Sequence, residues 1–291
     1  MEINFIKFTH IYKENIGLDV YIPKCASKPL PVIVYIHGGA LIWGSRENVH
    51  RDELTAVLDE GMAYVSIDYR LAPETKLMDI QDDVKDAFNW VRGTGVDLYD
   101  FDVNRIAALG KSAGGYLALL SGTFDHKPQA IISFYGYGDI LGDCYSRPSQ
   151  HYLQFPSVPE DEAVKCIVQD VPTYAKGDDR WPIYLRARQT GTWASLVSGY
   201  EPSETNTALT AYCPILNIDE NFPPTFLLHG SADTDVPLEK STDMYDALIK
   251  KGIKTQLYIQ QEGHHGFDSK WKNTPEEFGE IIHFLKDTLR L

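Results

Sequence analysis

The sequence feature that most limits the fold is a serine between two glycines, Gly110-Lys111-Ser112-Ala113-Gly114. An apolar run, Arg105 to Leu109, precedes it, and a stretch of small and apolar residues, Gly115 to Leu120, follows it. Such a string also occurs in ordinary Gly-Ser loops, but here the flanks predict a buried strand, a sharp turn and a helix. In an elbow of this kind the serine backbone is strained, and a side chain at either glycine would collide with the neighbouring strand or helix. The hydroxyl of Ser112 is therefore expected to point outward, over the start of the helix.

A glycine turn follows a second strand upstream. The run Pro31 to Ile36 predicts a fully buried strand, and it leads directly into His37-Gly38-Gly39-Ala40. Backbone N–H groups in such a turn are unobstructed, so they can stabilise the negative charge that ester hydrolysis places on the carbonyl oxygen. We expect the N–H groups of Gly38, Gly39 and Ala113 to form this oxyanion hole. We interpret His37 as a structural organiser of the loop and not as a proton carrier.

A carboxylate lies just beyond a later strand. The run Thr225 to Leu228 predicts another buried strand, and Asp233 comes four residues after the histidine that ends it, His229. Asp235 is a second candidate. Because an Asp with a Pro two residues further on is typical of a helix start, we expect Asp235 to cap the following helix and Asp233 to belong to the site.

The histidine of the site comes after the next predicted strand, Gln256 to Gln260, in the segment Glu262 to Phe267. His265 stands directly before Gly-Phe, and the adjacent His264 would point the other way, so we expect His265 to be the base. The order of the three candidates is then Ser112, Asp233 and His265. This is the order of the catalytic triad in α/β-hydrolases.

Together these motifs resemble a known family. His37 to Ala40, Asp68 to Glu74 and Gly110 to Gly115 are similar to segments of the hormone-sensitive-lipase-type esterases (fold-3 type) of the α/β-hydrolase superfamily. The segments around Asp233 and His265 also resemble the prolyl-oligopeptidase-like branch. The resemblance covers residues 16–136 and 213–291, and it implies a serine hydrolase that needs no cofactor.

Two positions depart from the pattern of that family. Relatives usually carry Asp before the nucleophile where this chain has Lys111, and many have a third glycine where it has Ala40. Neither change removes a catalytic atom, but both affect the expected substrate preference. We expect Lys111 to be exposed, with no part in catalysis.

The rest of the chain alternates strand-like and helix-like segments, as a mostly parallel sheet flanked by helices requires. Residues 3–22 predict antiparallel edge strands, and helices are expected from Leu77 to Gly93, from Leu238 to Gly252, and from an N-cap at Thr274 with Pro275 at the first helical position. The short parallel strands are expected at Val32–Ile36, Ala63–Ile67, Arg105–Leu109, Ala130–Phe134, Thr225–Leu228 and Gln256–Gln260. This pattern predicts an α/β-hydrolase core over residues 1–136 and 213–291.

The alternation breaks between Tyr137 and Tyr212. Loops longer than ~12 to 15 residues usually have structure or function of their own, and this segment is far longer. We expect residues 137–212 to form a mostly helical cap, or lid, over the active-site mouth, because insertions at the carboxyl ends of strands lie beside the elbow. Within it, Tyr152, Trp181 and Trp193 are candidates for substrate contact. The alternative is a surface insertion that touches no substrate.

The amino-acid composition limits the kinds of molecule that this chain is expected to bind. The formal net charge is −14 and the chain has no basic cluster, which argues against nucleic acid and anionic membrane surfaces. No apolar run approaches the ~18 residues of a membrane span, and the first residues do not form a secretory signal. We therefore expect a cytoplasmic protein in which the four cysteines are reduced and no metal is bound; assembly into a homo-oligomer stays open.

The expected reaction is hydrolysis of small soluble esters with short acyl chains, acetyl esters among them, through an acyl-enzyme on Ser112. The alternative reaction is cleavage of amides, peptides or arylformamides, which the prolyl-oligopeptidase-like segments permit. A third alternative is a non-catalytic ligand-binding relative. Such relatives lose the histidine, whereas this chain keeps Ser112, Asp233 and His265.

Overall fold

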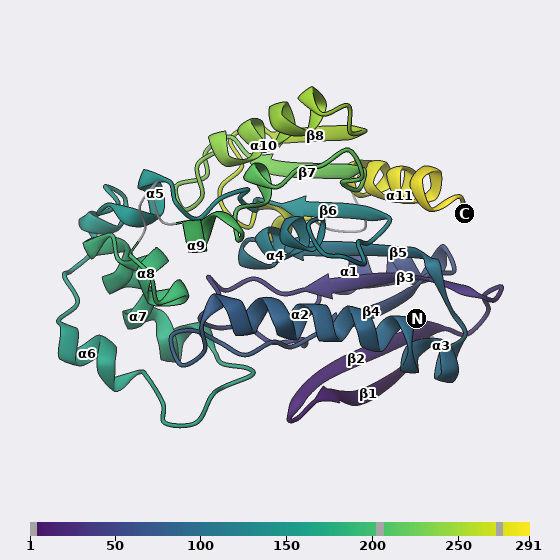
Figure 1. Ribbon diagram of the computed structural model, residues 1–291, viewed down its shortest axis with the longest axis horizontal. Coiled ribbons are helices and arrows are strands. Elements are labelled where there is room, and N and C mark those ends of the chain that lie inside the picture. The colour runs from purple at the N-terminus through teal and green to yellow at the C-terminus, as the bar shows by residue number, and fades with distance from the viewer. Residues whose placement is uncertain (1–4, 202–206, 272–275) are drawn as a thin grey trace.

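The fold is built on one eight-stranded sheet, whose strands lie one above another in Figure 1, from β1 at the bottom to β8 at the top. The computed structural model describes residues 5–201, 207–271 and 276–291. The strands lie in the order β1-β2-β4-β3-β5-β6-β7-β8. Their bounds are β1 Phe5–Lys13, β2 Ile16–Pro23, β3 Leu30–Ile36, β4 Ala63–Ile67, β5 Phe101–Lys111, β6 Ala130–Phe134, β7 Thr225–Gly230 and β8 Thr255–Gln260.

Six neighbouring strands, from β4 to β8 in the sheet order, run parallel. The predicted edge is an antiparallel hairpin of β1 and β2, and β2 also pairs antiparallel with β4. Strands β3, β4 and β6 are buried along their whole length, which explains why the sequence shows them as short continuous apolar runs. The prediction of a mostly parallel α/β sheet is therefore confirmed.

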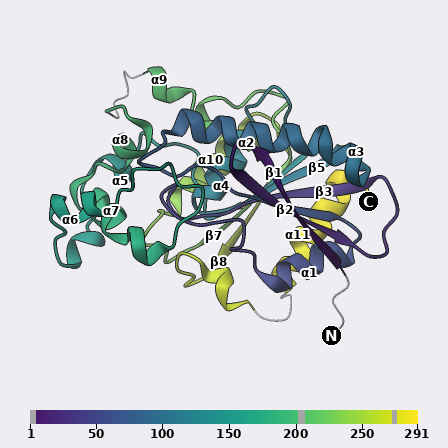
Figure 2. The same ribbon diagram turned by 90° about the horizontal axis from the view of Figure 1, so that it is seen from below.

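Helices cover both faces of the sheet (Figures 1 and 2). One face packs against α2 (Leu77–Arg92), α4 (Ala113–Ser121) and α10 (Glu239–Lys250), and the other against α1 (Arg51–Asp59) and α11 (Glu276–Leu289). The short helix α3 (Thr94–Tyr99) follows α2, whose C-cap is Gly93 as the sequence predicts. The predicted N-cap Thr274 and the neighbouring Pro275 lie outside the described residues.

The segment after β6 is helical and lies at the carboxyl ends of the strands, at the left of Figure 1. Its α-helices and 3-10 helices (η) are α5 Asp143–Ser146, η1 Tyr152–Gln154, α6 Glu160–Lys165, α7 Gly177–Thr190, α8 Trp193–Ser198, α9 Thr207–Thr210 and η2 Pro214–Leu216. A further short helix, η3 Phe267–Lys270, precedes α11. Helix α7 buries seven of its fourteen residues, so the segment packs against the core and is not a detached insertion.

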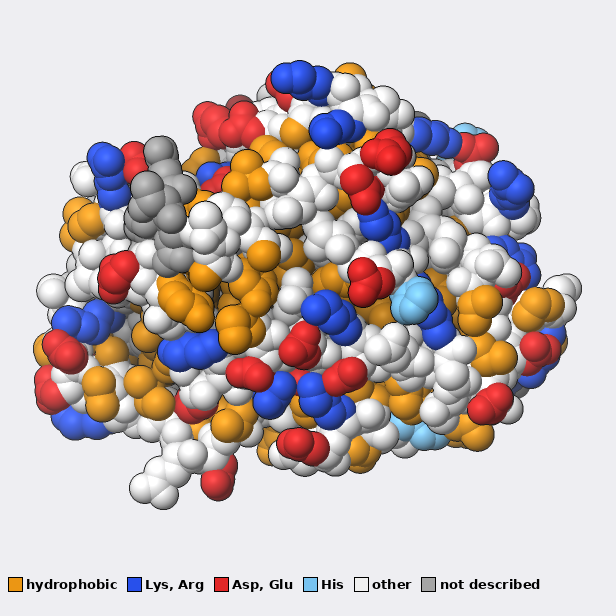
Figure 3. Space-filling model, viewed as in Figure 1, with side chains coloured by type: hydrophobic (Ala, Val, Ile, Leu, Met, Phe, Trp, Pro, Cys, Tyr) orange, Lys and Arg blue, Asp and Glu red, His pale blue; other side chains and the backbone are white. Residues whose placement is uncertain are grey.

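On the face shown in Figure 3, basic and acidic side chains are interspersed, and hydrophobic ones gather toward the end where the helical segment meets the sheet. Within the described part of the chain, no helix has the length and apolar character needed to cross a bilayer.

Candidate active site

The serine elbow has the geometry that its sequence predicts. Strand β5 ends at Lys111, Ser112 follows with φ 55° and ψ −121°, and helix α4 begins at the next residue. A Cβ on Gly110 would lie 2.0 Å from the carbonyl oxygen of Gly114, and one on Gly114 would lie 2.0 Å from that of Ile36. Any side chain at these two positions would therefore force the strand and the helix apart.

The structure brings the three triad candidates into one hydrogen-bonded chain. The Ser112 hydroxyl lies 2.9 Å from Nε2 of His265, and Nδ1 of that ring lies 2.7 Å from Oδ2 of Asp233. The Oδ1 atom of Asp233 accepts the N–H groups of Asp235 and Val236, each at 2.9 Å. This arrangement fixes the tautomer in which Nδ1 carries the proton and Nε2 faces the serine.

Nearby carboxylates set the charge of the histidine. Burial alone would lower the pKa of His265, but the carboxylates of Asp235, Asp233 and Asp268 outweigh it, so the pKa is raised above its usual value. Burial would raise the pKa of Asp233, yet its hydrogen bonds to His229 and His265 hold it well below the usual range. Asp233 is therefore ionised whenever His265 accepts a proton.

The glycine loop lies against the nucleophile. A Cβ on Gly38 would lie 2.8 Å from the Lys111 carbonyl oxygen and 3.2 Å from the Ser112 Cβ, so a side chain here would crowd the serine elbow. His37 is fully buried and stacks on Tyr69 at 4.3 Å between ring centroids, while its Nδ1 lies 2.7 Å from the carbonyl oxygen of Gly38. Burial lowers the pKa of His37 to about 4, so the ring is neutral and holds the loop in place.

His264 has a different environment from its neighbour. Its side chain is exposed, and its Nδ1 lies 3.0 Å from the carbonyl oxygen of Ala232. The ring of His265, in contrast, packs against that of Tyr135 at 4.6 Å. Only His265 of the two lies within hydrogen-bond distance of Ser112 in the structure.

The expectation that Lys111 is exposed is wrong. Its side chain is 11% exposed, and Nζ lies 2.7 Å from Glu53 Oε2 in α1 and 2.6 Å from Asp268 Oδ2 in η3. The hydroxyl of Tyr135 donates to the other oxygen of Asp268 at 2.6 Å. Because Asp268 follows His265 by three residues, this buried ion pair ties the serine elbow to the histidine loop.

The expectation that Asp235 caps a helix is also wrong. Helix α10 begins at Glu239, and its N-cap residue, Leu238, makes no side-chain cap. Asp235 instead turns toward α7, where its Oδ1 lies 2.6 Å from Nη1 of Arg188 and accepts the Tyr184 hydroxyl. The local helix-start pattern is overridden because a buried arginine offers the carboxylate a stronger partner.

The three predicted substrate-contact residues differ in position. Tyr152 and Trp181 belong to an aromatic cluster with Tyr184 and with Trp43, which follows the glycine loop; ring centroids are 5.3–6.3 Å apart. Trp181 is 37% exposed. Trp193 is buried, and its Nε1–H donates to the carbonyl oxygen of Ala40 at 3.1 Å. Trp193 therefore links the helical segment to the glycine loop.

Sequence reasoning missed several charged and hydroxyl groups around the triad. No local pattern marks them, because each acts through partners far away in the chain: the Lys111 to Asp268 bond spans 157 residues, and the Arg188 to Asp235 bond spans 47. The missed residues are Glu53, Tyr135, Tyr184, Arg188 and Asp268, whereas for Lys111 and Asp235 the sequence pattern predicts other positions.

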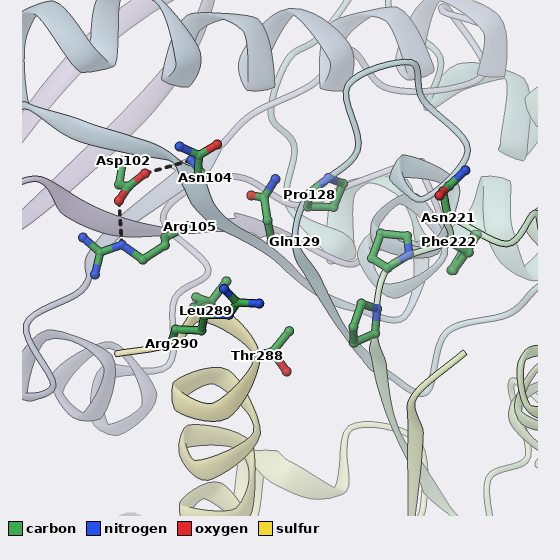
Figure 4. A pocket seen from close by; sticks show the side chains of 12 residues that line it. Asp102, Asn104, Arg105, Pro128, Gln129, Asn221, Phe222, Thr288, Leu289 and Arg290 are labelled. Atoms are coloured by element: carbon green, nitrogen blue, oxygen red, sulfur yellow. Dashed lines mark hydrogen bonds and ion pairs between the residues drawn. The ribbon is translucent and has the colours of Figure 1, made fainter. Parts of the chain in front are cut away.

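A separate pocket of about 610 Å³ lies at the other end of the sheet (Figure 4). It is lined by the start of β5, the residues before β6 and β7, and the end of α11, including Arg105, Gln129 and Leu289. These are the amino ends of the strands, whereas Ser112, Asp233 and His265 follow the carboxyl ends, where ligands bind in open α/β sheets. Across residues 5–201, 207–271 and 276–291, no three His, Cys, Asp or Glu side chains gather as metal ligands would.

The mostly parallel sheet with helices on both faces is the fold of solved α/β-hydrolase proteins. The family model BD-FAE matches residues 18–248, more than half of the chain, and the chain belongs to this family. An α/β-hydrolase superfamily protein from Enterococcus faecalis shares the fold with a TM-score of 0.76 at 22% identity, covering 97% of this chain and 99% of that one. Carboxyl esterase 2 from Tuber melanosporum shares it with a TM-score of 0.69 at 20% identity, covering 99% and 89%.

Curated relatives include far longer proteins. A non-reducing polyketide synthase from Penicillium brasilianum is 27% identical over 96% of this chain, and one from Emericella nidulans is 29% identical over 89%. The chain spans 14% and 13% of the lengths of these two synthases.

Proposed function

We propose that the protein is a serine hydrolase that cleaves small carboxylic esters through an acyl-enzyme on Ser112. The observation that carries this proposal is the continuous hydrogen-bonded chain from Ser112 through His265 to Asp233. The glycine loop beside the serine supports it, because N–H groups there can bind an oxyanion. The shared fold with a carboxyl esterase is consistent with an ester bond as the target.

In the first half-reaction, Nε2 of His265 takes the Ser112 proton as the hydroxyl oxygen attacks the ester carbonyl. The new C–O bond forms a tetrahedral intermediate whose oxyanion is bound by the N–H groups of Gly38, Gly39 and Ala113. Asp233 holds the ring and stabilises the imidazolium. The imidazolium then gives its proton to the leaving alcohol as the original ester bond breaks, and the acyl group stays on the serine.

In the second half-reaction, water replaces the alcohol. His265 takes one proton from the water molecule as the water oxygen attacks the carbonyl carbon of the acyl-enzyme. It then returns that proton to the Ser112 oxygen as the carboxylic acid leaves. The products are the free acid and the original serine, so no cofactor enters the balance.

We also propose that residues 137–212 act as a cap that favours short acyl chains. Trp181 and Tyr152 would occupy the space that a longer chain requires, and each methylene that stays unburied forfeits about 0.8 kcal/mol. Their ring contacts to Trp43 support this role, since Trp43 follows the glycine loop.

The test is Ser112→Ala. Hydrolysis of p-nitrophenyl acetate should fall to less than about 1% of wild type, since loss of a triad member costs orders of magnitude in rate. A fluorophosphonate probe should label the wild type and not the variant, and thermal unfolding should show that the variant is folded. A folded variant that keeps more activity than this would overturn the assignment of the nucleophile. An aryl amide and N-formylkynurenine, assayed in parallel, separate ester from amide cleavage.

A further inference from the structure

Asp235 places a second carboxylate beside the catalytic histidine. Its Oδ2 lies 3.6 Å from Nε2 of His265, the nitrogen that faces Ser112. The triad carboxylate, Asp233, lies on the other side of the ring, at Nδ1. Asp235 therefore does not occupy the position of the triad carboxylate. It lies on the side of the ring on which the leaving alcohol is protonated, because Nε2 delivers the proton to that alcohol.

Neighbouring side chains fix this carboxylate and neutralise it. Arg188 contributes Nη1 to Oδ1 at 2.6 Å and Nη2 to the backbone oxygen of Asp235 at 3.0 Å, and the Tyr184 hydroxyl also donates to Oδ1. The arginine is 3% exposed, so the ion pair cannot rearrange freely. These contacts occupy Oδ1, the Tyr152 hydroxyl also lies close to the carboxylate, and Oδ2 faces the histidine. The side chain of Asp235 keeps 18% exposure, unlike its buried partner.

A carboxylate oxygen can only accept a hydrogen bond, so a group that binds it must be a donor. A cationic ligand would gain little binding free energy at Asp235, because Arg188 already balances the charge of this carboxylate. A neutral hydroxyl loses less on leaving water and still forms a charge-assisted hydrogen bond. A hydroxyl on the carbon adjacent to the one that bears the ester oxygen would lie within reach of Oδ2 when the ester oxygen lies at Nε2.

We propose that Asp235 accepts a hydrogen bond from a hydroxyl of the leaving alcohol, on the carbon adjacent to the one that bears the ester oxygen. The site would then be matched to monoesters of vicinal polyols. This inference rests on the proposed function, since it needs ester cleavage at Ser112. It makes Asp235 a specificity-determining residue. Arg188 and Tyr184 act through Asp235 and are positioning residues.

The experiment compares 2-hydroxyethyl acetate with 2-methoxyethyl acetate, which has a similar inductive effect but no donor. We expect wild type to favour the hydroxyl substrate by at least about tenfold in kcat/KM, as hydrogen bonds to charged groups do. In Asp235→Ala this ratio should fall to near one. Tyr184→Phe is the matched control: it removes one contact to Oδ1 but keeps the carboxylate and Arg188, so it should lower the preference less than Asp235→Ala does.

Loss of stability alone lowers both rates and leaves their ratio unchanged. If Asp235→Ala does not fold, Asp235→Asn serves instead, and the ratio should fall several-fold because the acceptor loses its charge. A wild type without preference, or an Asp235 variant that keeps it, would overturn the proposal. So would faster cleavage of 2-(trimethylammonio)ethyl acetate, which would assign a cation to the site. The methoxy substrate distinguishes the two proposals: if wild type cleaves neither ester, the proposed function itself fails.

Discussion

Replacing Lys111 by methionine should destabilise the protein strongly. Methionine has a similar length and no charge, so the change removes the cation and keeps most of the packing. Glu53 and Asp268 would then be left buried, with side-chain exposures of 5% and 6%, and without their shared partner. Breaking a buried ion pair from one side costs about 3 to 5 kcal/mol. This is a large share of the roughly 5 to 15 kcal/mol that stabilises a typical domain.

The pH dependence of this loss has a definite sign. Burial would raise the pKa of Asp268, but Lys111 and the Tyr135 hydroxyl bring it below the usual value. A carboxyl with a depressed folded-state pKa stabilises the fold above its unfolded pKa, and this stability is lost as the pH falls through the folded pKa. In Lys111→Met burial dominates, so the pKa of Asp268 rises and the group can become neutral at mildly acidic pH. The stability gap between wild type and variant should therefore narrow as the pH falls.

Urea unfolding at about pH 7 and about pH 4.5 measures both effects. Lys127→Met is a matched control, because it breaks an ion pair to Asp219, which is 49% exposed, and should cost less than about 1 kcal/mol. A Lys111→Met variant that loses no more than this control, or whose deficit is the same at both pH values, would refute the account of a buried network. The kcat should fall as well, since the histidine loop loses its tie to the elbow.

Further variants test the other groups of the site. His265→Ala and Asp233→Asn should each lower kcat/KM by about 10³-fold or more, whereas His264→Ala should stay within about threefold of wild type; an inactive His264→Ala variant would reassign the base. Asp235→Asn removes one of the carboxylates that raise the pKa of His265, so the acidic limb of kcat/KM, which reports deprotonation of this ring, should move to lower pH. Trp181→Ala should shift the preferred acyl chain upward in a p-nitrophenyl ester series from acetate to laurate, and an unchanged profile would contradict the proposed role of the cap.

The elbow and the strands of the sheet can be predicted from the sequence, because short stretches of neighbouring residues determine both. A strand buried on both faces must be a short apolar run, and the approach of Gly110 and Gly114 to neighbouring backbone leaves no room for a Cβ, so the pattern around Ser112 permits few folds. The candidate triad follows from chain order, since parallel strands place Asp233 and His265 at the same edge of the sheet.

The surroundings of the triad are not readable in this way. Lys111 in the elbow looks like an exposed residue until α1 supplies Glu53 and η3 supplies Asp268. Asp235 matches a helix-start pattern in the sequence, but in the structure it pairs with Arg188 of α7. In both cases a long-range partner of opposite charge overrides a local preference. Sequence separation hides such partners, because nothing in a short window shows which helix will cover it.

These two networks have one physical consequence in common. The candidate base, His265, is surrounded by Asp233, Asp235 and Asp268, and all three raise its pKa. A triad needs only one carboxylate on the ring, at Nδ1; additional unpaired carboxylates would hold the proton on the histidine and oppose its transfer to the leaving group. Lys111 pairs with Asp268 and Arg188 pairs with Asp235, so each extra carboxylate has its own buried cation. The two cations offset part of the effect of Asp235 and Asp268, although the pKa of His265 is still raised, and the pair to Arg188 makes that pKa depend on the packing of α7.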